Sequence, residues 1–269
     1  MDGNIAFLGT GRMAGAIIQG LIANKLFDPS QIKGLGGKGN TVRKLAEDSG
    51  ITGVDNLKEL LKGASTLVLA CKPQHFSELS DSLVSQTRGR LVISILAGIP
   101  LRLLAKKFPE AVAVVRSMPN TPGQIGLGAT VYCANHPLQE PVKKQVESIL
   151  GSLGMVLPVL EDQVDLITAL SGSGPAYIFE MGAGLVEAAS QLGLPRPIAD
   201  QLVRQTFLGA STLLHQKTQV QPEDLRNEVT SPGGTTEAGL SIFQKKGFRE
   251  TLLQVLTAAR NRSIELAHY

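Results

Sequence analysis

Three small residues near the start of the 269-residue chain, Gly9, Gly11 and Ala14, have the spacing G-x-G-x-x-A. They follow an apolar run at 5–8 and open a helical pattern at 12–24, the context in which this motif binds the pyrophosphate of a dinucleotide. The first glycine allows a tight turn, the second lets the backbone approach the phosphates, and the alanine lets helix and strand pack closely. Free N–H groups at the helix N-terminus then face the pyrophosphate. The spacing therefore predicts a dinucleotide-binding turn.

The segment 34–40 at the end of a second apolar run distinguishes between two cofactors. It carries no acidic residue, whereas NAD-dependent enzymes usually place Asp or Glu there to hold the ribose 2′-hydroxyl. Lys38 lies in this segment, and Arg43 lies near the start of the next helical pattern. Cations and small residues suit a 2′-phosphate, so the sequence favours NADP(H), with NAD(H) possible. Ordinary solvated charge is the alternative interpretation of both cations.

Two further segments follow apolar runs. Residues 70–73 read Ala-Cys-Lys-Pro, and residues 94–98 read Ser-Ile-Leu-Ala-Gly. Ligands of open α/β sheets bind beyond the carboxyl ends of the strands. Both segments are therefore candidates to line the nicotinamide ribose pocket, although each is also compatible with a plain strand exit.

Short apolar runs alternate with helical patterns over the first 160 residues. The runs lie at 5–8, 32–35, 66–70, 91–95, 112–116, 129–133 and 155–159. The helical patterns lie at 12–24, 40–49, 57–62 and 137–150. This alternation predicts βαβ units and a mainly parallel sheet.

After about Glu161 the strand signal ends. Six helical patterns follow, at 162–170, 175–192, 196–216, 224–229, 235–245 and 249–268. We therefore predict an α/β fold, with a Rossmann-type doubly wound sheet domain at 1–160 and an all-helical domain at 161–269.

The composition excludes several classes of protein. The chain is 43% hydrophobic and 18% charged, with a net charge of +3 and no long basic run, so no nucleic-acid surface is expected. The chain has no stretch of about 18 apolar residues, so no membrane span is expected, and no signal peptide is expected either. Cys71 and Cys133 lie in apolar segments, and the histidines share no metal-ligand spacing, so we expect no metal site. Two reduced thiols fit a cytoplasmic protein.

Several predicted helices are apolar on more than one face. In the helix at 175–192 the apolar residues include Ile178, Phe179, Met181, Leu185, Val186, Ala188 and Ala189. A small helical domain cannot cover this much apolar surface alone, so we expect a partner subunit to cover it. Tight internal packing is the alternative.

Two later segments are more specific. Residues 170–177 read Leu-Ser-Gly-Ser-Gly-Pro-Ala-Tyr, and residues 229–240 read Val-Thr-Ser-Pro-Gly-Gly-Thr-Thr-Glu-Ala-Gly-Leu. Together with the turn at 9–15, Lys72-Pro73 and the Met-Pro-Asn-Thr-Pro segment at 118–122, they make the chain resemble the pyrroline-5-carboxylate reductase family over nearly its whole length. The resemblance implies reduction of 1-pyrroline-5-carboxylate to L-proline with NAD(P)H, the last step of proline biosynthesis. It also implies a C-terminal helical domain that forms an interlocked homodimer, with dimers assembling further.

The resemblance also carries over functional positions. With Lys38, the candidate cofactor residues are Leu8, Gly9, Thr10, Gly11, Arg12, Met13, Gly36, Asn56, Ala70, Cys71, Lys72, Pro73, Ile95, Leu96 and Ala97. The candidate substrate residues are Glu161, Ser231, Gly233, Gly234, Thr235 and Thr236, with Thr236 as the catalytic residue. Gly36 departs from the family, which has a polar residue at this part of the 2′-phosphate site.

The chemistry of imine reduction fits the later segment. Gly233 and Gly234 expose backbone N–H groups before a helix that starts near Thr235, and this is a natural seat for the substrate carboxylate. The Thr236 hydroxyl can bond the ring nitrogen. No general acid stands out, so water or prior protonation of the imine supplies the proton. The resemblance makes Glu161 a substrate-proximal acid, although capping or salt-bridging a helix is an equal alternative.

Other functions remain open at this point. A β-hydroxyacid reductase on the same plan would need a lysine in the helical domain, and the chain offers none there before Lys217. A reductase of another cyclic imine is a second alternative. A third is a catalytically silent, NADP(H)-binding regulatory paralogue, which would be expected to have lost the segment at 230–236.

Overall fold

The computed structural model describes residues 3–37 and 39–266. Two compact units make up the chain: a sheet unit, residues 1–173 with 259–269, and a helical unit, residues 174–258. The predicted domain boundary at 160/161 lies just after the last strand and stays a prediction. Lys38 and His268 lie outside the described residues.

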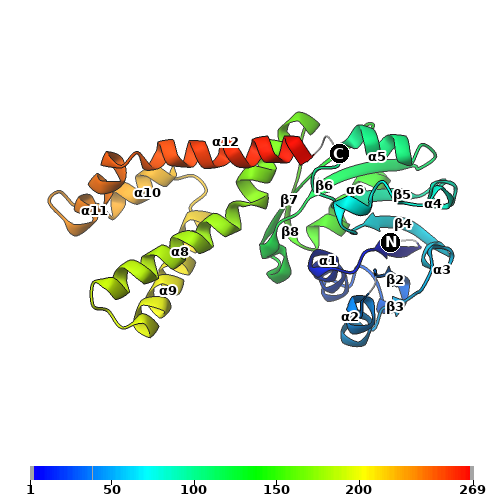
Figure 1. The fold of residues 1–269 in the computed structure, drawn as a ribbon, viewed down its shortest axis with the longest axis horizontal. Helices are drawn as coiled ribbons and strands as arrows, with labels where there is room; N and C mark the ends of the chain where they lie inside the picture. Colours follow the sequence, from blue (N-terminus) through cyan, green and yellow to red (C-terminus); the bar gives the residue numbers. More distant parts are fainter. Residues whose placement is uncertain (1–2, 38, 267–269) are drawn as a thin grey trace. The chain divides into compact units, whose positions relative to one another are not determined.

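The sheet unit contains one eight-stranded sheet (Figure 1). Its strands are β1 (Asn4–Leu8), β2 (Ile32–Leu35), β3 (Thr52–Gly53), β4 (Ala64–Leu69), β5 (Leu91–Ser94), β6 (Ala113–Met118), β7 (Gly128–Ala134) and β8 (Gly154–Pro158). Their order across the sheet is β3-β2-β1-β4-β5-β6-β7-β8. The described pairs are parallel except β6 with β7. The chain builds outward from β1 in one direction and then in the other, so the switch point lies between β1 and β4.

Helices connect and follow the strands. They are α1 (Arg12–Ala23), α2 (Thr41–Ser49), α3 (Leu57–Leu61), α4 (Asp81–Gln86), α5 (Leu101–Lys107), α6 (Glu140–Gly151), α7 (Val164–Ile167), α8 (Gly174–Gln191), α9 (Arg196–Gln216), α10 (Pro222–Glu228), α11 (Thr235–Lys245) and α12 (Phe248–Leu266).

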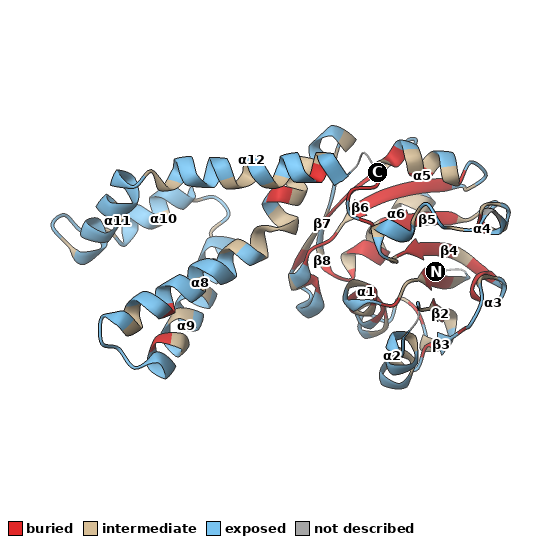
Figure 2. Ribbon diagram, in the orientation of Figure 1, coloured by how far each residue is buried: buried red, intermediate tan, exposed pale blue. Residues whose placement is uncertain are grey.

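Successive strand side chains enter two separate cores, one on each face of the sheet. In β1, Ile5 and Phe7 pack on one face and Ala6 packs on the other. Side chains of α1 and α6 complete the first core, and those of α3, α4 and α5 complete the second. Figure 2 shows the buried residues concentrated in the strands. Both faces are covered, which explains why the strands read as continuous apolar runs.

The predicted α/β class with a Rossmann-type sheet is confirmed, and each of the seven apolar runs overlaps a strand. The sequence reading missed β3, α4 and α5. β3 is two exposed residues long, and α4 and α5 are only six and seven residues long, so none carries a long periodic pattern. The single helix predicted at 162–170 is instead a 3₁₀ turn, α7 and a π-helical turn at Thr168–Gly172.

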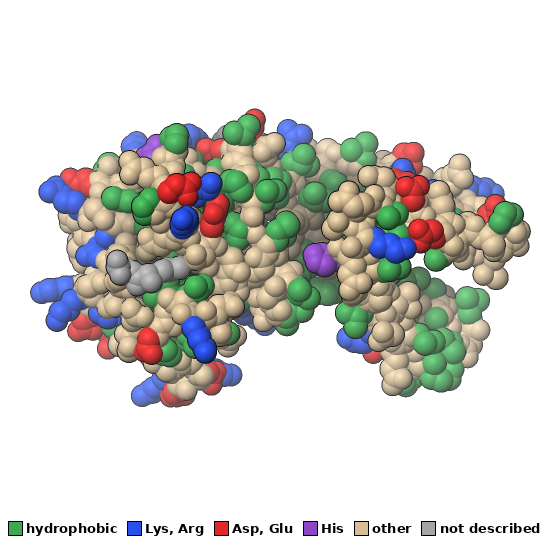
Figure 3. All heavy atoms as spheres, turned by 180° about the vertical axis from the view of Figure 1, so that it is seen from behind, with side chains coloured by type: hydrophobic (Ala, Val, Ile, Leu, Met, Phe, Trp, Pro, Cys, Tyr) green, Lys and Arg blue, Asp and Glu red, His purple; other side chains and the backbone are tan. Residues whose placement is uncertain are grey.

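The helical unit contains a closely packed helix pair. Gly182 of α8 lies against Phe207 of α9, where an added Cβ would be 3.1 Å from the phenyl ring. Large apolar side chains nevertheless remain exposed, among them Phe179 at 70% and Leu208 at 61%. Figure 3 shows hydrophobic side chains gathered at the surface over α8 and α9. Tight internal packing therefore does not account for the apolar faces of these helices.

Within the described residues, no helix has the length and apolar character needed to cross a membrane. The same part of the chain contains no cluster of three or more His, Cys, Asp or Glu residues that could hold a metal ion.

Candidate active site

Three strand exits lie side by side at the switch point of the sheet. The N–H of Ala70 donates to the carbonyl of Leu8 at 2.8 Å, and the N–H of Ile95 donates to the carbonyl of Leu69 at 3.0 Å. The N–H of Gly9 donates to the last carbonyl of β2 at 2.8 Å. These bonds carry the ladder one residue beyond the strands. The structure thus brings the three predicted cofactor segments of β1, β4 and β5 to one edge.

The turn after β1 contains one tightly packed glycine and one open glycine. Gly9 has φ +103°, and a Cβ there would lie 2.3 Å from the carbonyl oxygen of Ala70. Gly11 is the N-cap of α1 and no side chain caps the helix, while a Cβ on Gly11 would meet nothing within 4 Å. The backbone is therefore close to β4 at Gly9 and open at Gly11. This open space beside the free N–H groups of α1 fits the phosphates of a dinucleotide.

A hydrogen bond joins this turn to the start of α2. The hydroxyls of Thr10 and Thr41 are 3.1 Å apart, and Thr10 is 7% exposed. Gly36 lies against the same threonine, because an added Cβ would be 3.0 Å from its Oγ1 and 3.1 Å from Cβ of Val42. The tight fit gives a physical reason for a glycine where the family has a polar side chain.

Arg43, a candidate for the 2′-phosphate, and Asn56, a candidate for another cofactor contact, have different surroundings. Arg43 is exposed on α2, with its Nε 4.0 Å from Glu47. Asn56 is the N-cap of α3, and its Oδ1 accepts from the N–H of Glu59 at 3.0 Å. Asn56 therefore has a structural role whether or not it also contacts a cofactor.

The exits of β4 and β5 contain both buried and accessible groups. Burial raises the pKa of the half-buried Cys71 thiol, while Lys72 is exposed and precedes a 3₁₀ turn at Pro73–His75. Leu96 is 3% exposed and belongs to the core, and its N–H donates to the hydroxyl of Ser94 at 3.2 Å. Ala97 is exposed.

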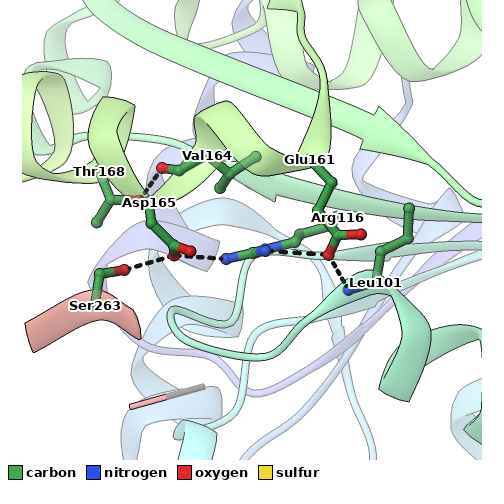
Figure 4. A network of polar contacts seen from close by, with 7 residues as sticks. All are labelled: Leu101, Arg116, Glu161, Val164, Asp165, Thr168 and Ser263. Atoms are coloured by element: carbon green, nitrogen blue, oxygen red, sulfur yellow. Dashed lines mark hydrogen bonds and ion pairs between the residues drawn. The ribbon is translucent and has the colours of Figure 1, made fainter. Parts of the chain in front are cut away.

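Glu161 belongs to a network around a buried guanidinium (Figure 4). Its Oε1 accepts from the N–H of Leu101, at the start of α5, at 2.5 Å and from Nη1 of Arg116 at 3.2 Å. The Arg116 side chain is 5% exposed, and that of Glu161 is 38% exposed. Glu161 thus caps a helix and pairs with a buried cation, the structural alternative recognised from the sequence, while part of its carboxylate stays accessible.

The second half of the network reaches the last helix. Nη2 of Arg116 lies 3.3 Å from Oδ1 of Asp165, and the hydroxyl of Ser263 on α12 donates to that oxygen at 2.8 Å. Arg116 thereby links β6, α7 and the end of α12 (Figure 4). The sequence analysis missed Arg116, Asp165 and Ser263. A charged residue inside an otherwise apolar strand was the available signal.

Asn120, in the Met-Pro-Asn-Thr-Pro segment, was also missed as a separate residue. Its Oδ1 accepts from the N–H of Ala129 at 2.8 Å, and its Nδ2 donates to the carbonyl of Ser171 at 3.0 Å. Asn120 therefore ties the loop after β6 to β7 and to the segment at 170–177.

The predicted substrate loop lies in the helical unit. Ser231, Thr235 and Thr236 are exposed, and α11 begins at Thr235 without a side-chain cap. Gly233 and Gly234 line an open groove of about 1210 Å³ between α10, α11 and the start of α12. The two glycine N–H groups already have partners, since that of Gly233 donates to Glu237 and that of Gly234 to Ser231.

Comparisons with known proteins identify the family of the chain. Residues 161–266 match the family model for pyrroline-5-carboxylate reductase dimerisation, and residues 4–98 match that for coenzyme F420-dependent NADP oxidoreductases. The chain is 37% identical to a pyrroline-5-carboxylate reductase of Synechocystis over 99% of both chains, and 34% identical to one of Arabidopsis thaliana over 98% of this chain and 95% of that one.

Solved structures show the same similarity. A pyrroline-5-carboxylate reductase from Coxiella burnetii has a TM-score of 0.91 and 38% identity, with 99% of each chain covered. A pyrroline carboxylate reductase from Plasmodium falciparum with NADP bound has a TM-score of 0.86 and 28% identity, with 98% of each chain covered. The chain belongs to the pyrroline-5-carboxylate reductase family.

Proposed function

We propose that this protein reduces 1-pyrroline-5-carboxylate to L-proline, the last step of proline biosynthesis, with a hydride from NAD(P)H. The observation that carries the proposal is that this family member has both the turn that would bind the dinucleotide and the loop that would bind the substrate. The turn at Gly9 and Gly11 has room for a dinucleotide, and Thr235 and Thr236 open α11 without a side-chain cap. A regulatory paralogue has no need of the second loop.

The cofactor that we propose is NADP(H), with NAD(H) as a weaker alternative. The pyrophosphate contacts would come from the backbone of the Gly9–Gly11 turn and the first N–H groups of α1. The 2′-phosphate would lie near Gly36 and Thr41, in a segment that has no carboxylate to repel it. When bound, the nicotinamide supplies the hydride; the protein supplies position and charge.

The substrate would be held by the helical loop. The N-terminal turn of α11 favours an anion and suits the substrate carboxylate, and the Thr236 hydroxyl would bond the ring nitrogen. Glu161, whose side chain is 38% exposed, would be a substrate-proximal acid. Because a protonated imine accepts hydride more readily, these groups need only orient the iminium, and water or prior protonation supplies the proton.

The assembly that we propose is a homodimer, from which larger homo-oligomers can form. The support is the exposed apolar surface of α8 and α9 together with the match of residues 161–266 to a dimerisation domain. The proposed location is the cytoplasm, where both free cysteines would stay reduced.

The test is NADPH oxidation by the purified full-length protein with 1-pyrroline-5-carboxylate, repeated with NADH and with the ring-expanded cyclic imine. We expect turnover with NADPH, slower turnover with NADH, and preference for the five-membered ring. An absence of turnover with either cofactor would refute the proposal and favour a regulatory paralogue. Preference for the larger ring would favour a reductase of another cyclic imine.

A further inference from the structure

The loop at 231–236 uses its glycine N–H groups internally. The N–H of Gly233 donates to Oε2 of Glu237 at 2.7 Å, and that of Gly234 donates to the carbonyl of Ser231 at 3.0 Å. The helical ladder of α11 begins only when Ala238 N–H donates to the carbonyl of Gly234 at 3.2 Å. The donors that precede this bond are those of Thr235, Thr236 and Glu237 itself. A helix leaves these first N–H groups for other partners.

Glu237 holds this loop in a defined shape. It is the third residue of α11, and its carboxylate turns back toward the residue before the N-cap, much as a capping-box glutamate does. Gly233 has φ +72°, a conformation that L side chains rarely adopt. A Cβ on Gly234 would be 2.5 Å from Oγ of Ser231. The glycines permit the tight turn, and the Glu237 hydrogen bond closes it.

We propose that Glu237 is a positioning residue for imine reduction. Its carboxylate accepts from the Gly233 N–H, so the seat for the substrate carboxylate shifts to the N–H groups of Thr235 and Thr236. The same bond fixes the start of α11 and with it the Thr236 hydroxyl. This inference rests on the proposed function and changes one part of it: Gly233 becomes part of the framework instead of a ligand contact.

A competing arrangement predicts the opposite change in KM for the imine when Glu237 is removed. If the Glu237 carboxylate were only a stand-in that the substrate carboxylate displaces from Gly233, its removal would free a donor and lower KM for the imine. If Glu237 positions the loop, its removal loosens the loop and raises that KM.

The experiment compares Glu237→Ala with Glu237→Gln in the full-length protein. We expect the alanine variant to raise KM for 1-pyrroline-5-carboxylate about tenfold, as the loss of a hydrogen bond to a charged group implies, with KM for NADPH unchanged. The glutamine variant keeps an oxygen acceptor for Gly233 N–H and should stay within about threefold of the parent. Glu250→Ala removes another carboxylate from the same groove without touching this bond, and is the matched control.

A second measurement separates this inference from the proposed function. Hydrogen exchange of the amides at 229–240 should be faster in Glu237→Ala and near the parent rate in Glu237→Gln, whether or not the imine is turned over. An alanine variant with unchanged exchange, or with an unchanged or lower KM, overturns the inference. So does a glutamine variant as impaired as alanine, because charge and not the hydrogen bond would then be the cause. A parent protein without turnover refutes the proposed function alone.

Discussion

Arg116 and Glu161 form an ion pair in which the guanidinium is almost fully buried and the carboxylate is not. Nη1 of Arg116 lies 3.2 Å from Oε1 of Glu161, and the two side chains are 5% and 38% exposed. A buried cation needs its partners, because an unpaired charge in a protein interior carries a large desolvation penalty. Glu161, the acid that family resemblance places near the substrate, is thus held in position by its ion pair with Arg116 on β6.

This pair gives a prediction about stability. Arg116→Met leaves Glu161 and Asp165 without their cation, so we expect it to lower the free energy of unfolding by about 3 kcal/mol. Urea denaturation at fixed protein concentration measures the change. Arg88→Met is the matched control, since Arg88 pairs with Glu110 at the surface and should cost less than about 1 kcal/mol. Equal effects of the two substitutions would contradict a special role for Arg116.

Substitutions of the two glycines in the turn after β1 should have different effects, one on stability and the other on NADPH affinity. Gly9→Ala forces a side chain into a strained conformation against Ala70, and should lower the free energy of unfolding by more than about 2 kcal/mol. Gly11→Val meets open space, so the protein should stay folded, but the valine occupies the space proposed for the pyrophosphate. Its Kd for NADPH should rise at least about tenfold. Fluorescence titration with NADPH and thermal unfolding of both variants distinguish the outcomes; normal NADPH affinity in Gly11→Val would be inconsistent with this turn as the binding site.

The segment after β2 should set the choice of cofactor. Gly36→Asp introduces the charge that repels a 2′-phosphate and accepts from a ribose 2′-hydroxyl, so the ratio of kcat/KM for NADPH to that for NADH should fall at least about tenfold. Gly36→Asn makes the same steric contact with Thr10 and Val42 without the charge. If the asparagine variant shows the same ratio as the aspartate variant, the effect is one of crowding.

Thr236→Ala tests the catalytic assignment. Loss of the hydroxyl removes the proposed bond to the ring nitrogen, so kcat/KM for the imine should fall about tenfold or more while Kd for NADPH stays the same. Thr236→Ser keeps the hydroxyl and should recover most of the activity. The role is refuted by unchanged kinetics in the alanine variant.

The two cysteines should react differently with iodoacetamide. Burial raises the pKa of Cys71, and burial with the nearby negative charge of Glu161 raises that of Cys133 to about 11. Thiolate forms only as pH rises toward these values, so alkylation of Cys71 should be slow near neutral pH and accelerate at alkaline pH. Cys133 is 8% exposed and should stay unmodified in the folded protein. Mass spectrometry with Cys71→Ser as control measures both sites, and NADPH should slow the reaction at Cys71. Rapid alkylation at neutral pH would contradict the assigned burial.

Local patterns were enough to predict much of the fold. The strand at β1 and the helix at α1 are confirmed because apolar periodicity and the glycine spacing depend only on neighbouring residues. The helices α9 and α11 begin and end where their patterns do. The short β3 and the capped α4 were missed, since neither has enough residues to show a period.

The candidate site also contains residues that local sequence patterns identify and residues that they do not. Gly9 and Gly11 were identified from sequence because a tight turn requires those residue types at that spacing. Arg116 was not, because its partners Glu161 and Asp165 come 45 and 49 residues later in the chain. The charge inside an apolar strand marks Arg116 alone, and no short window of sequence contains both this arginine and its partners.

The sequence by itself determined the dinucleotide turn and the family, since both depend on residue types at fixed spacings. Only the tertiary structure decided which atoms remain free to bind. It commits one oxygen of Glu161 to Leu101 and Arg116, and it commits the Gly233 N–H to Glu237. The physical reason is that an N–H has one proton to donate and a carboxylate oxygen has two lone pairs, so the partners that the folded chain brings within reach leave fewer of them for a ligand.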